Sequence, residues 1–351
     1  MACSVALAEP HRTFHRAIAG AAPHQMMMMR APSPVAAPAP EQTRLSDLDW
    51  IGDLGVGGFA CVTKARHRRT GAVFALKMSF DDGPDIEEEA KVLSRAAGSP
   101  HVIDCHYAML RAPGGEPAFL LEIMDAGSLG RIMRRRPGKG IPEAALAEVA
   151  AQCVVSLAQL HSRGVAHLDV KPDNFLANSR GEIKISDFNT SRILYGGAGE
   201  HLQVRIACST SSYFSPERFA PNTHAGPHGA MAADVWGLGI TVLELFLGRF
   251  AVLADAEKAS VEEVKQAICH GGPPRVPDEA EASAELRRFV AACHSATAAR
   301  APVHHSPRRR GVKARAAGAH RRDTVTVGAE NLGNRIIDCS SEFDLTIHRF
   351  G

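Results

Sequence analysis

The fold of this chain is decided by one stretch, His167-Leu168-Asp169-Val170-Lys171-Pro172-Asp173-Asn174-Phe175-Leu176. It follows an apolar segment with helical spacing and places charged side chains between apolar ones. A potential base, a cation and an amide fall within six residues, which is unusual for a loop with only a structural role. The stretch therefore marks a candidate catalytic loop.

The sequence patterns on the two sides of this loop differ. From Trp50 to Met124, short apolar runs alternate with turn residues, as is typical of strands, except for a helical pattern over Ile86–Ala97. From Pro142 onward the apolar residues recur with helical spacing, most clearly over Ala144–Ser162. A β-rich front followed by an α-rich rear predicts an α+β fold of two lobes.

The overall composition is that of a protein with a substantial core. The chain has 351 residues, of which 45% are hydrophobic, and a formal net charge of +2. These values exclude wholesale disorder and give no general reason to expect a nucleic-acid or membrane partner. The most apolar stretch, Val235–Ala254, is interrupted by Glu244 and Arg249, so it predicts a buried helix. Eight scattered cysteines without a CxxC pair indicate free thiols in a reducing compartment.

Two further motifs precede the loop. Gly55-Val56-Gly57-Gly58 lies between two strand-like runs, which suits a hairpin folded over a nucleotide's phosphates, although an ordinary Gly-rich turn would look the same. Lys77 ends a buried strand, and a buried lysine needs a carboxylate partner. Glu87, Glu88 and Glu89 in the following helix all offer one.

Three more motifs follow the loop, namely Asp187-Phe188-Asn189, Ser215-Pro216-Glu217 and Asp234-Val235-Trp236-Gly237-Leu238-Gly239. In this order and at these separations the six motifs resemble the eukaryotic protein kinases. The string from Tyr213 to Arg218 resembles the MAP kinase kinases in particular, especially those of plants. The resemblance spans Leu48 to Arg300, about 70% of the chain.

This resemblance implies a two-lobed protein kinase fold and a division of the chain. A kinase domain is expected over 47–300, with an N-lobe at about 47–124 and a C-lobe at about 125–300. The Ala/Pro/Met-rich tail at 1–46 is expected to be disordered, and so is the atypical basic tail at 301–351.

The resemblance also implies a role for each motif residue. Asp169 would accept the proton of the substrate hydroxyl, Lys171 would lie beside the γ-phosphate, and Asn174 and Asp187 would bind Mg²⁺. Asp234 would anchor the loop. The implied nucleotide-binding residues are Leu54, Gly55, Gly57, Gly58, Val62, Ala75, Lys77, Glu89, Leu121, Glu122, Met124, Leu176 and Asp187.

Two pairings are implied as well. Glu89 is the expected partner of Lys77, because Glu89-Ala90-Lys91-Val92-Leu93 matches the family's spacing, with Glu88 as the fallback. Glu217 would pair with an arginine late in the C-lobe, for which Arg300 is the candidate.

The chain departs from the family at its regulatory positions. Leu168 stands where an arginine usually grips an activation-loop phosphate, and Glu200 and Ile206 stand at the usual phosphorylation sites. Asn189 replaces a glycine that lets this peptide adopt positive φ and change between states, so reduced mobility without loss of Mg²⁺ is expected there. The hydroxyls of Thr190, Ser191 and Ser209 remain in this segment. We therefore expect low basal activity that does not depend on phosphorylation at the usual pair.

The function that the resemblance implies is an atypical MAP kinase kinase, which uses ATP and Mg²⁺ to phosphorylate Thr and Tyr of a MAP kinase. An upstream MAP kinase kinase kinase is a further expected partner. The alternative is a pseudokinase scaffold that binds cascade components without catalysis. The basic residues from Pro307 to Arg315 could form a nuclear-localisation or nucleic-acid patch, or simply a solvated tail. The expected location is the cytoplasm, and the nucleus is the second candidate.

Overall fold

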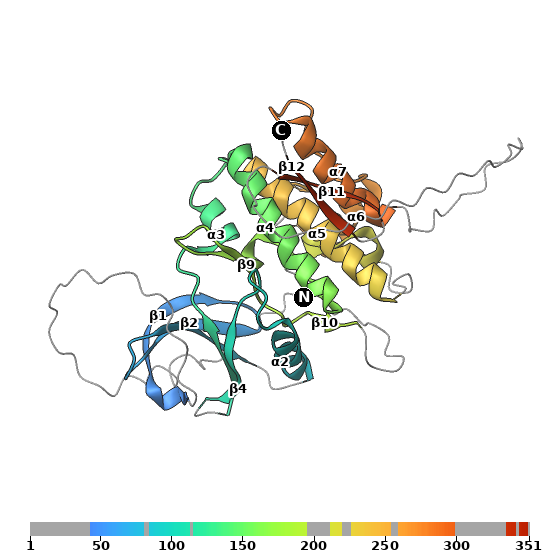
Figure 1. Ribbon diagram of the computed structural model, residues 1–351. Coiled ribbons are helices and arrows are strands. Elements are labelled where there is room, and N and C mark those ends of the chain that lie inside the picture. The colour runs from blue at the N-terminus through green and yellow to red at the C-terminus, as the bar shows by residue number, and fades with distance from the viewer. Residues whose placement is uncertain are drawn as a thin grey trace, which may run out of the picture. The chain divides into compact units, whose positions relative to one another are not determined.

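The residues that the computed structural model describes are 43–80, 84–112, 115–194, 211–219, 226–253, 259–298, 335–341 and 344–349. Contacts between Cα atoms divide the chain into two units. The first comprises Met1–Ala90 and Asp104–Ile123, and the second comprises Lys91–Ile103 and Met124–Gly351. The elements of both units are labelled in Figure 1.

The first unit is built on a five-stranded antiparallel sheet in the order β1-β2-β3-β5-β4. Its elements are η1 (Leu45–Asp47), β1 (Leu48–Val56), β2 (Ala60–His67), β3 (Val73–Ser79), β4 (Cys105–Arg111), β5 (Pro117–Glu122) and the part of α2 (Pro84–Ala96) up to Ala90. Phe74, Leu76 and Met78 alternate along β3, so they share one face of the sheet. They form the apolar core of this unit with Leu120 of β5.

The second unit is mainly helical, as the helical spacing after Pro142 predicts. Its helices are α3 (Leu129–Arg134), α4 (Glu143–Ser162), α5 (Gly226–Leu247), α6 (Val261–His270), α7 (Ala284–Ala298), η2 (Pro172–Asn174), η3 (Ser211–Tyr213) and η4 (Pro216–Phe219). Its small sheets consist of β6 (Gly127–Ser128), β8 (Phe175–Ala177) and β9 (Ile183–Ile185), and of β7 (Val165–Ala166) and β10 (Arg192–Ile193). Figure 1 shows α4, α5 and α7 side by side.

Helix α5 forms the centre of this unit. Its Trp236 and Ile240 pack with Val264 and Ile268 of α6. By length and composition, both α4 and α5 could cross a membrane, but 89% of the apolar window of α5 is buried inside the protein, as in a core helix. The prediction of a buried helix is confirmed, but the helix ends at Leu247 and does not continue to Ala254. Gly248 has a φ of 66°, a left-handed conformation that ends helices.

The end of the chain differs from the prediction of a disordered tail. Residues Arg335–Ser341 (β11) and Asp344–Arg349 (β12) form an antiparallel pair, and β11 lies against α7 and α4. Backbone strand pairing is thus found in a segment whose sequence did not indicate it. Residues 1–42 and 299–334, which include most of both predicted tails, lie outside the described residues.

The described cysteine side chains are free thiols, namely Cys61, Cys105, Cys153, Cys269 and Cys293. The prediction that the cysteines are not joined in disulfides is confirmed for these five. Burial raises the pKa of Cys105 to about 12. This thiol is therefore protonated and unreactive at neutral pH.

Candidate functional site

The loop between β7 and β8 brings together the three predicted catalytic residues. The Oδ2 atom of Asp169 lies 2.7 Å from Lys171 Nζ and accepts a hydrogen bond of 2.9 Å from Asn174 Nδ2. The same Nδ2 donates to the carbonyl oxygen of Asp169 at 2.8 Å. Within the part of the chain that the structure describes, the buried Oδ1 of Asp169 has no hydrogen-bond partner. One carboxylate oxygen is thus fixed, while the other can accept a proton.

Asp234 of α5 holds the backbone of this loop, as predicted. Its buried carboxylate accepts hydrogen bonds from the amides of His167 at 2.8 Å and Leu168 at 2.7 Å. The ring of His161 lies 2.9 Å from the same carboxylate. The loop is therefore tied to the central helix of the second unit immediately before Asp169.

His167 connects the loop to the strand and segment around Asp187, a role that the sequence did not reveal. Its Nδ1 accepts the amide of Asp169 at 3.2 Å, and its Nε2 lies 3.0 Å from the carbonyl oxygen of Ser186. This arrangement assigns the proton to Nε2. The carbonyl of His167 accepts the hydroxyls of Thr190 and Ser191, both at 3.1 Å. Ser191 is fully buried, so its hydroxyl has a structural role.

The backbone at Asp187 has a left-handed conformation. Among the described non-glycine residues, positive φ occurs at Met109, Leu168 and Asp187 (65°), and Asn189 is not among them. The strained peptide therefore lies at the predicted magnesium ligand itself. Asn174 is tied to this region, because its carbonyl accepts the amide and the hydroxyl of Ser186 at 2.8 and 3.1 Å.

Leu168, the residue in place of the usual arginine, packs into an apolar cluster. Its side chain is 3% exposed and contacts Ala166 of β7 and Ala230 of α5, with Leu194 packed against them. Leu194 also donates its amide to the carbonyl of Gly164 at 2.7 Å. The segment after Asp187 is thus attached to the catalytic loop by apolar packing and strand pairing.

Arg218 is a second residue whose role the sequence did not show. Its guanidinium donates to the carbonyl of Leu168 at 2.8 Å and lies 3.5 Å from the centre of the Phe214 ring. Burial lowers the pKa of Arg218 to about 10, so it stays charged at neutral pH. The neighbouring Glu217 has a pKa raised by burial. Its predicted partner Arg300 lies outside the described residues.

The first unit contains the predicted ion pair. Lys77 Nζ lies 2.6 Å from Glu89 Oε1, and both side chains are almost fully buried, at 7% and 2% exposure. This contact confirms Glu89 of α2 as the partner. Strand register places Gly55, Val62 and Lys77 in one row across β1, β2 and β3.

Five of the predicted nucleotide residues share one face of the sheet in the first unit, namely Gly55, Val62, Ala75, Lys77 and Leu121. Ala75 lies two residues before Lys77 and pairs with Leu121 of β5, so both project to the Lys77 face. This face is opposite to the one that carries the Phe74 core. The hairpin glycines Gly55 and Gly58 have open space where a Cβ would be, and neither has positive φ. Internal packing therefore gives no reason for glycine at these two positions.

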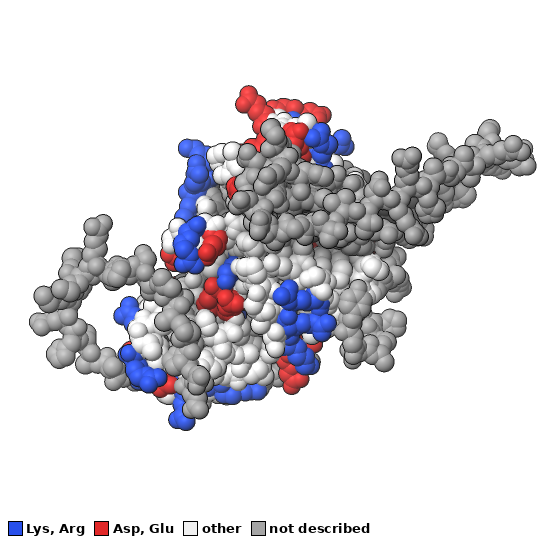
Figure 2. All heavy atoms as spheres, viewed as in Figure 1, with Lys and Arg blue, Asp and Glu red and all other residues white. Residues whose placement is uncertain are grey.

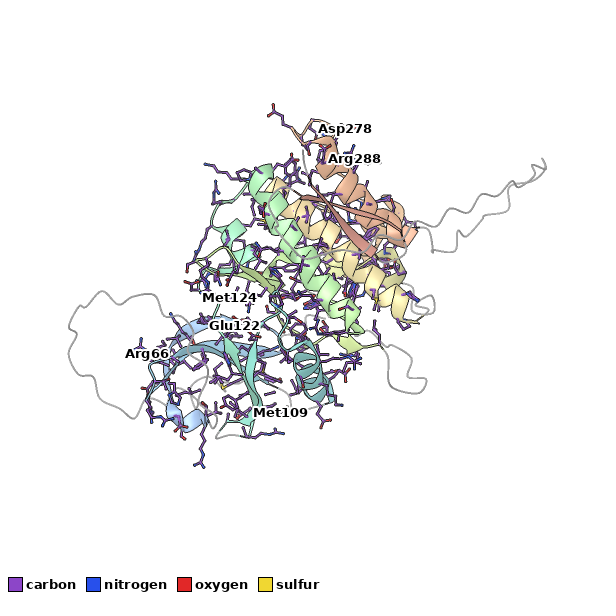
Figure 3. The ribbon with its side chains drawn as sticks, in the orientation of Figure 1. Arg66, Met109, Glu122, Met124, Asp278 and Arg288 are labelled. Carbon is purple, nitrogen blue, oxygen red and sulfur yellow. The ribbon has the colours of Figure 1, made fainter. Side chains whose placement is uncertain are left out.

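Of the remaining predicted residues, Leu54 and Glu122 lie in the first unit, and Met124 and Leu176 lie in the second. Glu122 ends β5 and Met124 follows shortly after it (Figure 3). Glu122 accepts the amide of Asp104 on its side chain at 2.8 Å and donates its own amide to Asp104 at 2.9 Å. Leu54 is exposed at the end of β1. Leu176 lies in β8 of the second unit.

Comparison with known proteins shows which family this chain resembles. Residues 49–304 match the family described as "Protein kinase domain". Mitogen-activated protein kinase kinase 9 of Arabidopsis thaliana is 34% identical over 252 residues, which cover 70% of this chain and 78% of that protein. Mitogen-activated protein kinase kinase 7 of the same plant is also 34% identical, over 71% and 78%. Protein kinase wis1 of Schizosaccharomyces pombe is 32% identical over 74% of this chain and 42% of its own length.

Proposed function

Because this chain belongs to the protein kinase family and is of the MAP kinase kinase type, we propose that it is an active kinase that phosphorylates Thr and Tyr of a MAP kinase. The names of the relatives supply the substrate class. The catalytic loop supplies the support for activity, since its three candidate catalytic side chains are present and both Lys171 and Asn174 contact Asp169.

The two oxygens of the Asp169 carboxylate have different surroundings, and this difference is the main support for the proposal. Lys171 and Asn174 hold Oδ2, whereas no described group bonds to the buried Oδ1. A buried carboxylate oxygen without a partner is costly, and such atoms persist where function needs them. Oδ1 is therefore the atom that would accept the proton of the substrate hydroxyl.

The residues of the chain fit ATP and Mg²⁺, which the family uses in general. Gly55 and Gly58 leave room for phosphate oxygens to approach the backbone, and the Lys77–Glu89 pair holds a cation on the same sheet face. The described residues contain no cluster of three or more His, Cys, Asp or Glu that could hold a metal by itself. This suits Mg²⁺, which commonly takes one or two protein ligands and completes its shell with water and phosphates.

Asn174 and Asp187 are the residues that would hold the metal. Both hydrogen bonds from Asn174 to Asp169 use the side-chain NH₂ group, so the side-chain oxygen of Asn174 takes no part in them. When bound, Mg²⁺ neutralises charge on the transferred phosphoryl group. Lys171 adds a positive charge next to the proton-accepting carboxylate.

We further propose that the catalytic loop is placed without activation-segment phosphorylation. The Leu168 cluster supports this, because an apolar side chain occupies the position from which an arginine would grip a phosphate. The burial of Ser191 removes one alternative phosphorylation site. Glu200, Ile206 and Ser209 lie outside the described residues.

A paired assay tests the proposal. The wild type and Asp169→Asn would be incubated with Mg·ATP and a panel of catalytically inactive MAP kinases, and phosphorylation would be read separately on Thr and Tyr. We expect signal on both residues from the wild type and none from the variant. Silence of both proteins, with retained binding of a MAP kinase by the wild type, would replace this proposal with the pseudokinase scaffold.

A further inference from the structure

A dense group of exposed cations lies on and after α3. Arg131, Arg134, Arg135, Arg136 and Lys139 fall within nine residues, and no acidic residue occurs between Ala126 and Pro142. We call these five residues the α3 basic patch. All five are exposed, and Figure 2 shows Lys and Arg side chains on the surface of the second unit, with Asp and Glu side chains beside some of them.

Only one member of the patch is neutralised within the described part of the chain. Arg134 forms a two-bond ion pair with Asp173, at 2.6 and 3.0 Å, whereas Arg131, Arg135, Arg136 and Lys139 have no carboxylate within ion-pair distance among the described residues. The patch therefore keeps a large excess of positive charge.

The ion pair between Arg134 and Asp173 holds the α3 basic patch against the catalytic loop. Asp173 directly precedes Asn174, and Ser128 at the start of α3 also donates to it, at 3.2 Å. A Cβ on Gly130 would lie 2.5 Å from Asp173 Oδ1, so α3 and the loop are in close contact. A polypeptide with its hydroxyl at Asp169 would therefore run near these cations.

The C-terminal end of the α3 basic patch is also held in place, by backbone hydrogen bonds to the end of α5 and the residue after it. Gly138 donates its amide to Gly248 at 3.2 Å, and Ile141 donates to Leu245 at 2.8 Å. Gly140 lies so close to the carbonyl of Phe246 that no side chain could be added there. The cations are thus presented from a rigid base. Favourable contact with the α3 dipole explains only cations in the last turn of the helix, namely Arg131 and Arg134.

We propose that the α3 basic patch binds an acidic segment of the protein substrate and holds it beside the catalytic loop. That the partner is a substrate rests on the proposed function, whereas the acidic chemistry rests on the charge of the patch. Single-stranded nucleic acid is disfavoured, because the segment from Ala126 to Pro142 contains no aromatic side chain on which bases could stack. An anionic membrane is tested as an alternative.

Binding is measured on the full chain by fluorescence anisotropy with two labelled peptides. One carries a run of glutamates beside a Thr and a Tyr, and the other has glutamine at each glutamate. We compare the wild type, Arg135→Glu/Arg136→Glu, and the control Arg275→Glu/Arg288→Glu, whose two arginines are also exposed in the second unit. Neither Arg135 nor Arg136 contacts Asp173, so the loop stays intact.

We expect the wild type and the control variant to prefer the glutamate peptide, and the patch variant to bind it about tenfold more weakly. The preference should fall as salt rises. Equal binding of the two peptides by the wild type would overturn the proposal, and so would equal weakening by the two variants. Stronger binding to phosphatidylserine vesicles, lost in the patch variant, would assign the patch to a membrane instead.

Phosphorylation of the glutamine peptide separates this inference from the proposed function. The patch variant should keep the wild-type kcat on that peptide, while its KM for the glutamate peptide rises. If the wild type phosphorylates neither peptide, the proposed function fails, but the anisotropy comparison still decides whether the patch binds acidic chains.

Discussion

Replacing Leu168 with alanine should lower the free energy of unfolding by about 3 kcal/mol. The substitution removes three buried carbons from the cluster with Ala166, Ala230 and Leu194. At about 0.8 kcal/mol per methylene, the lost transfer free energy is about 2.5 kcal/mol, and the remaining cavity adds to it. The backbone bonds to Asp234 and Arg218 do not involve the removed atoms.

Urea-induced unfolding followed by tryptophan fluorescence measures this loss. Leu54→Ala is the matched control, because Leu54 is exposed and should lose less than about 1 kcal/mol. Equal losses in the two variants would refute the claim that packing of Leu168 stabilises the loop.

Leu168→Arg tests whether an arginine at this position can bind a phosphate on the activation segment. The described side chains of the cluster are all apolar, so the guanidinium would be buried without a carboxylate partner. We expect a larger loss of stability than in Leu168→Ala, and kinase activity that phosphatase treatment does not lower further. A variant as stable as the wild type, with activity that falls on phosphatase treatment, would show that this position still accepts a phosphate-gripping arginine.

Three further substitutions test the buried polar groups. Asp234→Asn should cost about 3 kcal/mol in urea unfolding, because one amide of the loop would face the NH₂ group, and a loss below about 1 kcal/mol would contradict this. Burial raises the pKa of Glu244 to about 7, against the hydrogen bond from Tyr213, which lowers it. The folded state then binds this proton more tightly than the unfolded state, so the group contributes stability at low pH that is lost as pH rises from about 4.5 through about 7. Glu244→Gln should flatten that decline, and unfolding curves with unchanged pH dependence would count against it. Glu89→Gln should cost about 3 kcal/mol by removing the charge beside Lys77, and a double-mutant cycle with Lys77→Met should return a coupling well above zero.

Much of the fold could be predicted from the sequence, because local periodicity determines helices and strands. The helix predicted over Ala144–Ser162 spans Glu143–Ser162, and the one predicted over Ile86–Ala97 spans Pro84–Ala96. The Lys77–Glu89 pair could also be predicted, since a buried lysine needs a carboxylate and the motif spacing selects one of three neighbouring glutamates.

Other features depend on contacts between residues that are far apart in the chain, and spacing does not encode these. The apolar surroundings of Leu168 come from Ala230, and its carbonyl is held by Arg218. Similarly, Arg134 meets Asp173 only because α3 packs on the catalytic loop. Residue types at fixed spacing were enough to indicate the family, the candidate catalytic side chains and the bounds of two helices. Which oxygen of Asp169 is unbonded and what surrounds Leu168 depend instead on long-range packing, which sets the environment of each side chain.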